Sequence, residues 1–197
     1  MLQTAYGTLT VGLEARAGQS TLIRGGTSSV GMAAIVLAKR RGLQVIASTR
    51  REAAAAKLTQ LGADHVVIDD GAIAGWVRGL FPDGVDCAVE LVGVNVLKDT
   101  LRCVRTGGTA CFTGMLSDEW TIHEFYPMDW IPVGVRLTVY SGNSSHLSSG
   151  ALQEFIDAVY AGQVTVPLGR SYRMEDIVQA HRDMEVGVVG GKGVVLT

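Results

Sequence analysis

The sequence predicts an α/β fold in which a doubly wound, six-stranded parallel sheet is followed by a strand-helix-strand tail. From Ser20 onward, short runs rich in Val, Ile, Leu and Ala alternate with segments of helical spacing, which is the pattern of βαβ units. None of these runs alternates strictly between apolar and polar residues, as expected for strands covered on both faces. The chain has 197 residues, 47% of them hydrophobic, so one sizeable core is expected.

Six apolar runs are the expected strands, and four segments of helical spacing lie between them. The strand runs are 21–23, 43–47, 65–68, 85–91, 109–113 and 135–140. The helical segments are 30–41, 52–61, 73–80 and 96–104. The first helix ends in Lys39-Arg40-Arg41 before Gly42, where the cations complement the helix dipole and the glycine can take the left-handed cap.

The β-α alternation stops between Gly114 and Gly134. This stretch carries two tryptophans and two prolines, and long irregular segments of this kind are often lids or interfaces. A helix is expected over 147–160. The tail is expected to consist of a strand at 171–174, a helix at 175–186 and a strand at 193–196.

Composition and charge exclude several classes of protein. The formal net charge is -2 and there is no basic run, so neither nucleic acid nor an anionic membrane surface is an expected partner. No apolar run reaches the ~18–20 residues of a membrane span and no signal peptide is evident, so a cytoplasmic protein is expected. The three cysteines are odd in number and form no CxxC, which predicts buried free thiols and no zinc cluster.

The segment from Thr21 to Gly31 predicts a strand, a Gly/Ser turn and a helix, the arrangement found in Rossmann dinucleotide-binding folds. Gly26, Ser28 and Gly31 match GxGxxG with serine in the middle place. Such a turn lets the backbone approach a pyrophosphate, whose charge is held by the amides of the helix N-terminus. The alternative is a turn that serves the fold alone.

The residues after the second strand indicate which dinucleotide is bound. NAD-specific folds place an acid there on the ribose 2′-hydroxyl, but this chain has Ser48-Thr49-Arg50-Arg51. Cations at the start of the next helix are disfavoured by its dipole, and a bound 2′-phosphate would reverse that penalty. We therefore expect NADP as the cofactor, unless both arginines are simply solvated.

Catalytic and metal-binding residues are not evident. None of the four histidines has a Cys, Asp or Glu at metal-ligand spacing, and no Ser-His-Asp constellation is visible. Glu90 ends the fourth expected strand, where it can anchor the fold or help to position a cofactor. The catalytic residues stay unknown and no metal is expected.

Several motifs together resemble the medium-chain dehydrogenase/reductase superfamily, in its zinc-independent quinone oxidoreductase branch. They are the turn Arg24 to Gly31 followed by Ala33-Ala34-Ile35, the Leu61-Gly62-Ala63-Asp64 element, the strand ends Asp86 to Gly93 and Gly107 to Gly114, and the tail from Glu175 through His181 to Gly191-Lys192. The resemblance covers nearly the whole chain. It implies an NADPH-dependent oxidoreductase.

The resemblance also implies a division of the chain. Members of this family begin with a GroES-like catalytic domain, so the chain is expected to be a cofactor domain cut from a longer enzyme and inactive alone. Residues 1–19 would be a linking helix and lead-in, 20–167 the dinucleotide-binding domain, and 168–197 a tail that completes the catalytic domain.

Site residues follow from the resemblance position by position. The pyrophosphate is assigned to Gly26, Thr27, Ser28, Ser29 and Val30; the adenosine phosphate to Ser48, Arg50 and Arg51; the ribose side to Leu91, Val92 and Gly93; and the nicotinamide to Thr4, Thr113, Gly114 and Met115. No catalytic acid can be assigned, and zinc is disfavoured by the branch.

The leading functional hypothesis is the NADPH-binding domain of an oxidoreductase that transfers hydride to a quinone, enone or related carbonyl acceptor. The alternatives are a non-catalytic dinucleotide-binding module, the cofactor domain of a zinc-dependent alcohol dehydrogenase, and a nucleotide-cofactor methyltransferase. Methyltransferases of this kind generally have an acidic residue at the position that Ser48 occupies here. A homodimer is expected through the edge strand 135–140, because an unpaired apolar edge invites pairing with a second copy.

Overall fold

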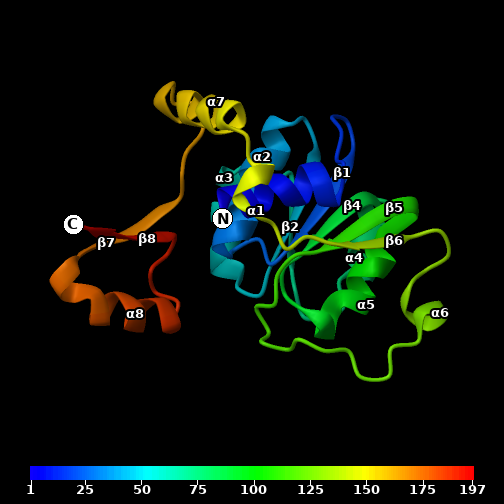
Figure 1. The fold of residues 1–197 in the computed structure, drawn as a ribbon. Helices are drawn as coiled ribbons and strands as arrows, with labels where there is room; N and C mark the ends of the chain where they lie inside the picture. Colours follow the sequence, from blue (N-terminus) through cyan, green and yellow to red (C-terminus); the bar gives the residue numbers. More distant parts are fainter. The chain divides into compact units, whose positions relative to one another are not determined.

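The computed structural model describes residues 1–197 and contains one six-stranded parallel sheet, of order β3-β2-β1-β4-β5-β6 (Figure 1). Its strands are β1 (Ser20–Arg24), β2 (Gln44–Thr49), β3 (His65–Ile68), β4 (Val85–Glu90), β5 (Val104–Phe112) and β6 (Arg136–Val139). The chain winds outward from β1 in one direction and then from β4 in the other. The predicted doubly wound α/β fold is confirmed, and its switch point lies between β1 and β4.

The helices lie between the strands, as predicted. They are α1 (Leu2–Gly7), α2 (Ser29–Arg40), α3 (Ala55–Gln60), α4 (Ala74–Leu80), α5 (Val94–Cys103), α6 (Pro127–Trp130), α7 (Ser149–Tyr160) and α8 (Ile177–Glu185). Gly42 has a φ of +76° and Gly62 a φ of +108°, so both glycines adopt the left-handed conformation expected after the preceding helices. None of the helices is long and apolar enough to cross a membrane.

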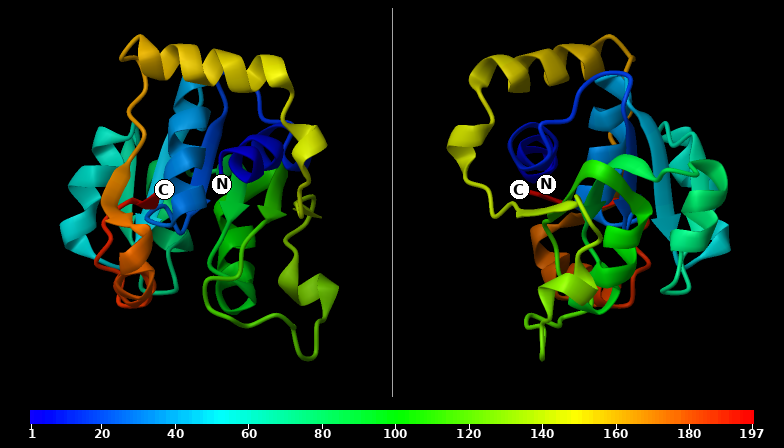
Figure 2. Two further views of the ribbon diagram at one scale, coloured as in Figure 1. Left: turned by 60° about the vertical axis from the view of Figure 1, so that its left-hand side comes forward. Right: turned by 90° about the vertical axis from the view of Figure 1, so that its right-hand side faces the viewer.

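The sheet is covered on both faces, which explains why its strands are apolar throughout. Every residue of β1 is buried, as are five of the six residues of β2. Helix α1 lies beside α2 (Figure 2), and α4 packs against α5. Right-handed crossovers place α2 on one face of a doubly wound sheet and α5 on the other. Cys87, Cys103 and Cys111 are free and buried, as the sequence predicted.

Two details differ from the sequence-based expectation. Strand β5 begins at Val104 rather than at residue 109, because Val104 already pairs with Val85 before the register shifts. The segment 114–134 contains the short helix α6 but is otherwise irregular. Trp120, Tyr126 and Met128 expose 68%, 59% and 83% of their surface, so this segment leaves large apolar side chains in contact with solvent.

The chain forms two compact units, Met1–Gln153 and Glu154–Thr197. In the second unit, strands β7 (Leu168–Arg173) and β8 (Lys192–Leu196) pair in parallel and α8 connects them. The Asp183 carboxylate of α8 accepts hydrogen bonds from Arg170, at 2.6 Å, and from the Tyr172 hydroxyl, at 2.9 Å. The units divide within α7, earlier than residue 168, where the sequence-based division begins the tail. That the tail completes another domain stays a prediction.

The glycine at position 31 is required by close packing rather than by its backbone angles. A Cβ atom there would lie 2.3 Å from the Gly25 carbonyl oxygen, whereas a Cβ on Gly75 of α4 would meet nothing within 4 Å. We expect Gly31→Ala to lower the free energy of unfolding by ~1–3 kcal/mol through overpacking. The matched control Gly75→Ala should raise it by up to ~1 kcal/mol, since alanine is the better helix former. Urea denaturation of both variants tests this, and equal effects would contradict it.

Candidate functional site

A cleft of about 350 Å³ lies at the carboxyl ends of the central strands. Ligands of open α/β sheets bind at this edge, next to the switch point. The lining residues come from the ends of β1 to β4 and from the segments that follow β1 to β5. They are Gly25, Thr27, Ser48, Thr49, Arg50, Asp69, Asp70, Gly71, Val92, Asn95, Val96, Leu116 and Ser117.

The Gly/Ser turn forms one wall of this cleft. Gly25 has a φ of +87°, and the Gly26 N–H donates to the Ser48 carbonyl at 2.9 Å, so the turn lies flat against the end of β2. Ser28 caps α2: its Oγ accepts from the Gly31 N–H at 3.0 Å and donates to the Gly25 carbonyl at 2.9 Å. The Ser28 hydroxyl is therefore committed to the turn.

The N-terminus of α2 keeps the capacity to bind an anion. The first N–H groups of a helix have no partner within it, and those of Ser29 and Val30 lie at this end of a 12-residue helix. Their partial positive charge favours a phosphate group. Thr27, immediately before the cap, lines the cleft. This geometry agrees with the pyrophosphate-binding turn expected from the sequence.

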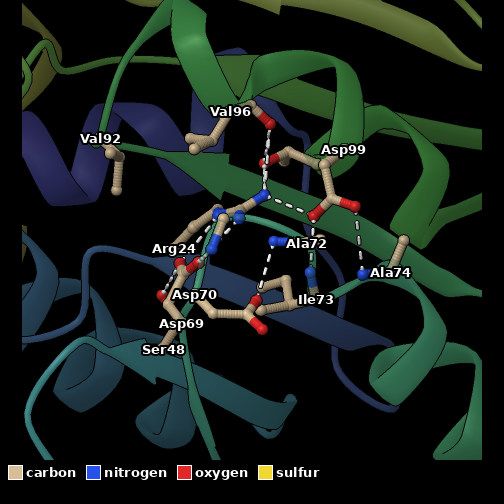
Figure 3. Close-up of polar contacts among 12 residues, drawn as sticks. Arg24, Ser48, Asp69, Asp70, Ala72, Ile73, Ala74, Val92, Val96 and Asp99 are labelled. Atoms are coloured by element: carbon tan, nitrogen blue, oxygen red, sulfur yellow. Dashed lines mark hydrogen bonds and ion pairs between the residues drawn. The ribbon is translucent and has the colours of Figure 1, made fainter.

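Arg24, the last residue of β1, is fully buried below the turn (Figure 3). Its Nε and Nη2 donate to the two carboxylate oxygens of Asp69 at 2.9 and 2.8 Å. Its Nη1 donates to Asp99 at 2.8 Å, to the Thr100 hydroxyl at 3.0 Å and to the Val96 carbonyl at 3.2 Å. Such a dense set of acceptors is what a buried guanidinium requires.

The Arg24 cluster extends to both sides of the cleft. The Ser48 hydroxyl donates to Asp69 at 2.9 Å and accepts from the Gly25 N–H at 3.1 Å. Asp99 also accepts from the Ile73 N–H at 2.9 Å, at the start of α4. Burial by itself would raise the pKa of Asp69, but the hydrogen bonds and charge of Arg24 outweigh it and the pKa is lowered. Asp69 is therefore ionised near neutral pH.

Glu90 holds the loop after β4. Its Oε1 accepts from the Val92 and Gly93 N–H groups at 2.6 and 3.1 Å, and its other oxygen accepts from the Thr100 hydroxyl. Burial raises the pKa of Glu90 to about 7, although these donors oppose the shift. The carboxyl group thus fixes the loop expected on the ribose side and is not available to solvent.

The residues expected around the nicotinamide lie together near the end of β5. The Thr8 hydroxyl, one turn after Thr4, is 3.1 Å from the Thr113 hydroxyl and donates to the Thr4 carbonyl at 2.8 Å. The Thr113 and Gly114 N–H groups donate to the Glu90 carbonyl at 2.9 and 3.1 Å. The linking helix and the ends of β4 and β5 are thereby joined.

The structure brings some of the expected site residues to the cleft and not others. Thr27, Ser48, Arg50 and Val92 line it. The other expected residues do not, and they are Thr4, Gly26, Ser28, Ser29, Val30, Arg51, Leu91, Gly93, Thr113, Gly114 and Met115. Ser48 is 1% exposed, and its hydroxyl group already donates a hydrogen bond to Asp69. Its role is therefore to support the turn. Sequence reasoning missed Asp69, Asp70, Gly71 and Asn95. Only their position in the sequence could have indicated a place in the cleft, because the first three directly follow a strand and so lie at the carboxyl edge of the sheet.

Comparison with known proteins identifies the family. Residues 29–158 match the profile of the zinc-binding dehydrogenase family. The chain belongs to this family. It is 28% identical over 173 residues to the quinone oxidoreductase of Rattus norvegicus, covering 86% of this chain and 52% of that protein. It is 27% identical over 189 residues to the quinone oxidoreductase of Homo sapiens, covering 92% of this chain and 55% of that protein.

Solved structures show the same fold. A crystal structure of Escherichia coli quinone oxidoreductase complexed with NADPH superposes on 100% of this chain and 62% of its own length, with a TM-score of 0.84 and 18% identity. The chain spans about half the length of the curated relatives it matches. The predicted resemblance to a quinone-oxidoreductase-like cofactor-binding domain is confirmed. No group of three or more His, Cys, Asp or Glu side chains among residues 1–197 is placed to hold a metal ion.

The raised pKa of Glu90 predicts a pH-dependent stability. The pKa of Glu90 is about 7 in the folded chain, whereas a glutamate in the unfolded chain has its ordinary pKa of 4.5. Since the folded state binds more protons between these values, the free energy of unfolding falls as pH rises through this window. We expect the titration of Glu90 to lower the free energy of unfolding by roughly 3 kcal/mol between pH 5 and pH 8.

The variant Glu90→Gln keeps an acceptor for the loop but does not titrate. Urea unfolding at pH 5 and pH 8 should therefore show that the wild type loses more stability than the variant over this interval. Parallel pH profiles of the two proteins would contradict the assignment of this titration to Glu90.

Proposed function

We propose that residues 1–197 form the NADPH-binding domain of an oxidoreductase that transfers hydride to a quinone, enone or related carbonyl acceptor. The observation that carries the proposal is a single cleft lined by Thr27, which immediately precedes the N-terminal cap of α2, and by Arg50 on another part of its wall. Pyrophosphate and 2′-phosphate are the two anionic groups of NADPH. The NADPH complex of the structurally similar Escherichia coli enzyme supports the choice of cofactor.

The residues of the site fit the parts of this cofactor. The N–H groups at the start of α2 would hold the pyrophosphate, and Arg50, whose side chain has no hydrogen-bond or ion-pair partner within the chain, would hold the 2′-phosphate. The loop Leu91–Gly93, held by Glu90, would support the ribose. Thr4 and Thr113 would flank the nicotinamide.

The nicotinamide of bound NADPH would supply the hydride, and the protein would supply position. Hydride transfer needs the acceptor held against one face of the ring with water excluded. The residues near Thr113 would give one side of such a cleft. We propose that the tail from residue 168 completes a further domain that gives the other side; the curated relatives are about twice as long as this chain.

The proposed role of Arg50 predicts a selective loss of NADPH affinity. Arg50→Ala should weaken NADPH binding about tenfold, because a charge-assisted bond to the 2′-phosphate is lost at an exposed site. NADH binding should not change. Calorimetric titration with both cofactors measures this.

The neighbouring arginine supplies the control. Arg51 is exposed and does not line the cleft, so Arg51→Ala should change the NADPH affinity by less than about twofold. Equal affinity of the wild type for the two cofactors would contradict the preference itself. Equal losses in the two variants would contradict the specific role of Arg50.

We further propose that two copies pair through the edge strand β6. Val139 of this strand is 73% exposed, and Val133 just before it is 92% exposed. The opposite edge strand, β3, is followed by Asp70, whose exposed charge disfavours close association. Pairing of β6 with its copy across a two-fold axis would satisfy its unpaired backbone groups and cover the apolar edge.

Light scattering at micromolar concentration tests the dimer. The wild type should have the mass of two chains, and Val139→Glu should shift it toward one, because like charges would face each other across the axis. Ile68→Glu, on the opposite edge strand, is the matched control and should leave the mass unchanged. A monomeric wild type would overturn the proposal.

A further inference from the structure

The cleft contains an acid beside the end of β2, although the segment that follows β2 has none. No Asp or Glu follows β2 within Ser48-Thr49-Arg50-Arg51. In the folded chain, however, an Asp69 carboxylate oxygen from the end of β3 lies 2.9 Å from the Ser48 hydroxyl oxygen at the end of β2. An acid at this edge is the group that takes the ribose 2′-hydroxyl in NAD-specific folds, and its charge would repel a 2′-phosphate.

The carboxylate of Asp69 has no acceptor site left for a ligand. One oxygen accepts from Arg24 Nε and from the Ser48 hydroxyl, each at 2.9 Å. The other accepts from Arg24 Nη2 at 2.8 Å and from the Gly71 N–H at 3.0 Å. An ionised carboxylate offers about four lone-pair sites, so these four donors saturate it.

The charge of Asp69 is also neutralised where it stands. The pair with Arg24 is bidentate, and the Asp69 and Arg24 side chains are 7% and 0% exposed. Solvent therefore screens this pair little, and the guanidinium opposes the field that the carboxylate would send into the cleft. Arg24 also pairs with Asp99, at 2.8 Å, so the two carboxylates share its charge. Asp70, the next residue, is more exposed and its side chain accepts only from the Ala72 N–H, at 3.0 Å. Arg50 is the cation of the cleft that remains without a partner.

We propose that Arg24 is a positioning residue that sets the cofactor preference: by saturating and neutralising Asp69, it removes an acid from the adenosine end of the cleft and leaves Arg50 to select NADPH over NADH. This inference rests on the proposed function. Arg24, the motif residue before Gly25, thus acts on specificity without touching the cofactor, because its buried guanidinium is bound to the carboxylates of Asp69 and Asp99 (Figure 3).

The test compares the dissociation constants of NADPH and NADH, by calorimetry at pH 8, for the wild type and three variants of the full chain. In Arg24→Gln the Asp69 carboxylate is exposed to the cleft, and we expect the preference for NADPH over NADH to fall about tenfold. In Arg24→Gln/Asp69→Asn the acid is absent, and the preference should return to within about twofold of the wild type. A ratio of two affinities is the readout because general loosening of the fold weakens both cofactors together.

The matched control is Arg24→Gln/Asp70→Asn. It has the same net charge as the rescuing variant and also loses one acid of the cleft, but it leaves Asp69 unmasked, so its preference should stay low. The proposal is overturned if Arg24→Gln leaves the ratio unchanged, if Asp69→Asn does not restore it, or if Asp70→Asn restores it equally.

If Arg24→Gln does not fold, the single variant Asp69→Asn decides the question. In Asp69→Asn the Arg24 guanidinium no longer pairs with a carboxylate at position 69, so its positive charge acts on the cleft. NADPH should therefore bind more tightly, while NADH binding is unchanged. A selective loss of NADH affinity would show that Asp69 binds the ribose, and no change would show that it is irrelevant; both overturn the proposal. If the wild type binds no NADPH, the proposed function fails and the inference falls with it, whereas a wild-type preference insensitive to Arg24 refutes the inference alone.

Discussion

The buried ion pair of Arg24 and Asp69 is the interaction on which the carboxyl edge of the sheet depends. A guanidinium with a fully buried side chain is stable only if its donors find acceptors, and here they come from the end of β3 and from α5. Removing one partner of such a pair typically costs ~3–5 kcal/mol, because a charge is left uncompensated. The position of the segment that carries Asp69 therefore depends on the position of the helix that carries Asp99.

The same cluster connects the two halves of the cleft. The Thr100 hydroxyl accepts from Arg24 and donates to Glu90, whose other oxygen holds the N–H groups of Val92 and Gly93. On the opposite side, Asp69 orients the Ser48 hydroxyl, which accepts from the Gly25 N–H. A continuous series of hydrogen bonds thus runs from the adenosine end to the ribose end, beneath the turn. The start of the Gly/Ser turn and the loop Leu91–Gly93 are thus both held by buried polar side chains.

The fold could be predicted from the sequence because its signals are local. The six apolar runs, the cations before Gly42 and the tight packing that Gly31 requires each act within one βα unit. The start of β5 was missed because Val104 pairs with Val85 of another strand, a contact that no local pattern records. Arg50 could be assigned to the site for the same local reason: it follows a strand directly.

The acid beside Ser48 could not be predicted, because it depends on strand order and register. Strand β3 pairs with β2 so that Ile68 lies opposite Thr49, and this register brings the next residue, Asp69, level with the end of β2. Arg24 belongs to the turn motif, but its charge matters only through partners that lie 45 and 75 positions away in the chain. A motif read along the chain therefore identifies which strand ends form the cleft, but not the charge that the cleft presents.

The charge that the cleft presents depends on how many hydrogen-bond donors each carboxylate already binds. Asp69 and Asp86 lie near the ends of strands and Asp99 lies within α5, and each already accepts several hydrogen bonds from within the chain. A carboxylate in this state is a structural anion: its lone pairs are used by donors within the chain, and it forms an ion pair there. Asp69 and Asp99 share the guanidinium of Arg24, and Asp86 pairs with Arg105. An acid selects a ribose hydroxyl only if at least one of its oxygens is left unsatisfied, so the presence of an acid near β2 does not by itself indicate NAD. In this fold the residue that completes its hydrogen bonding determines what the acid can recognise.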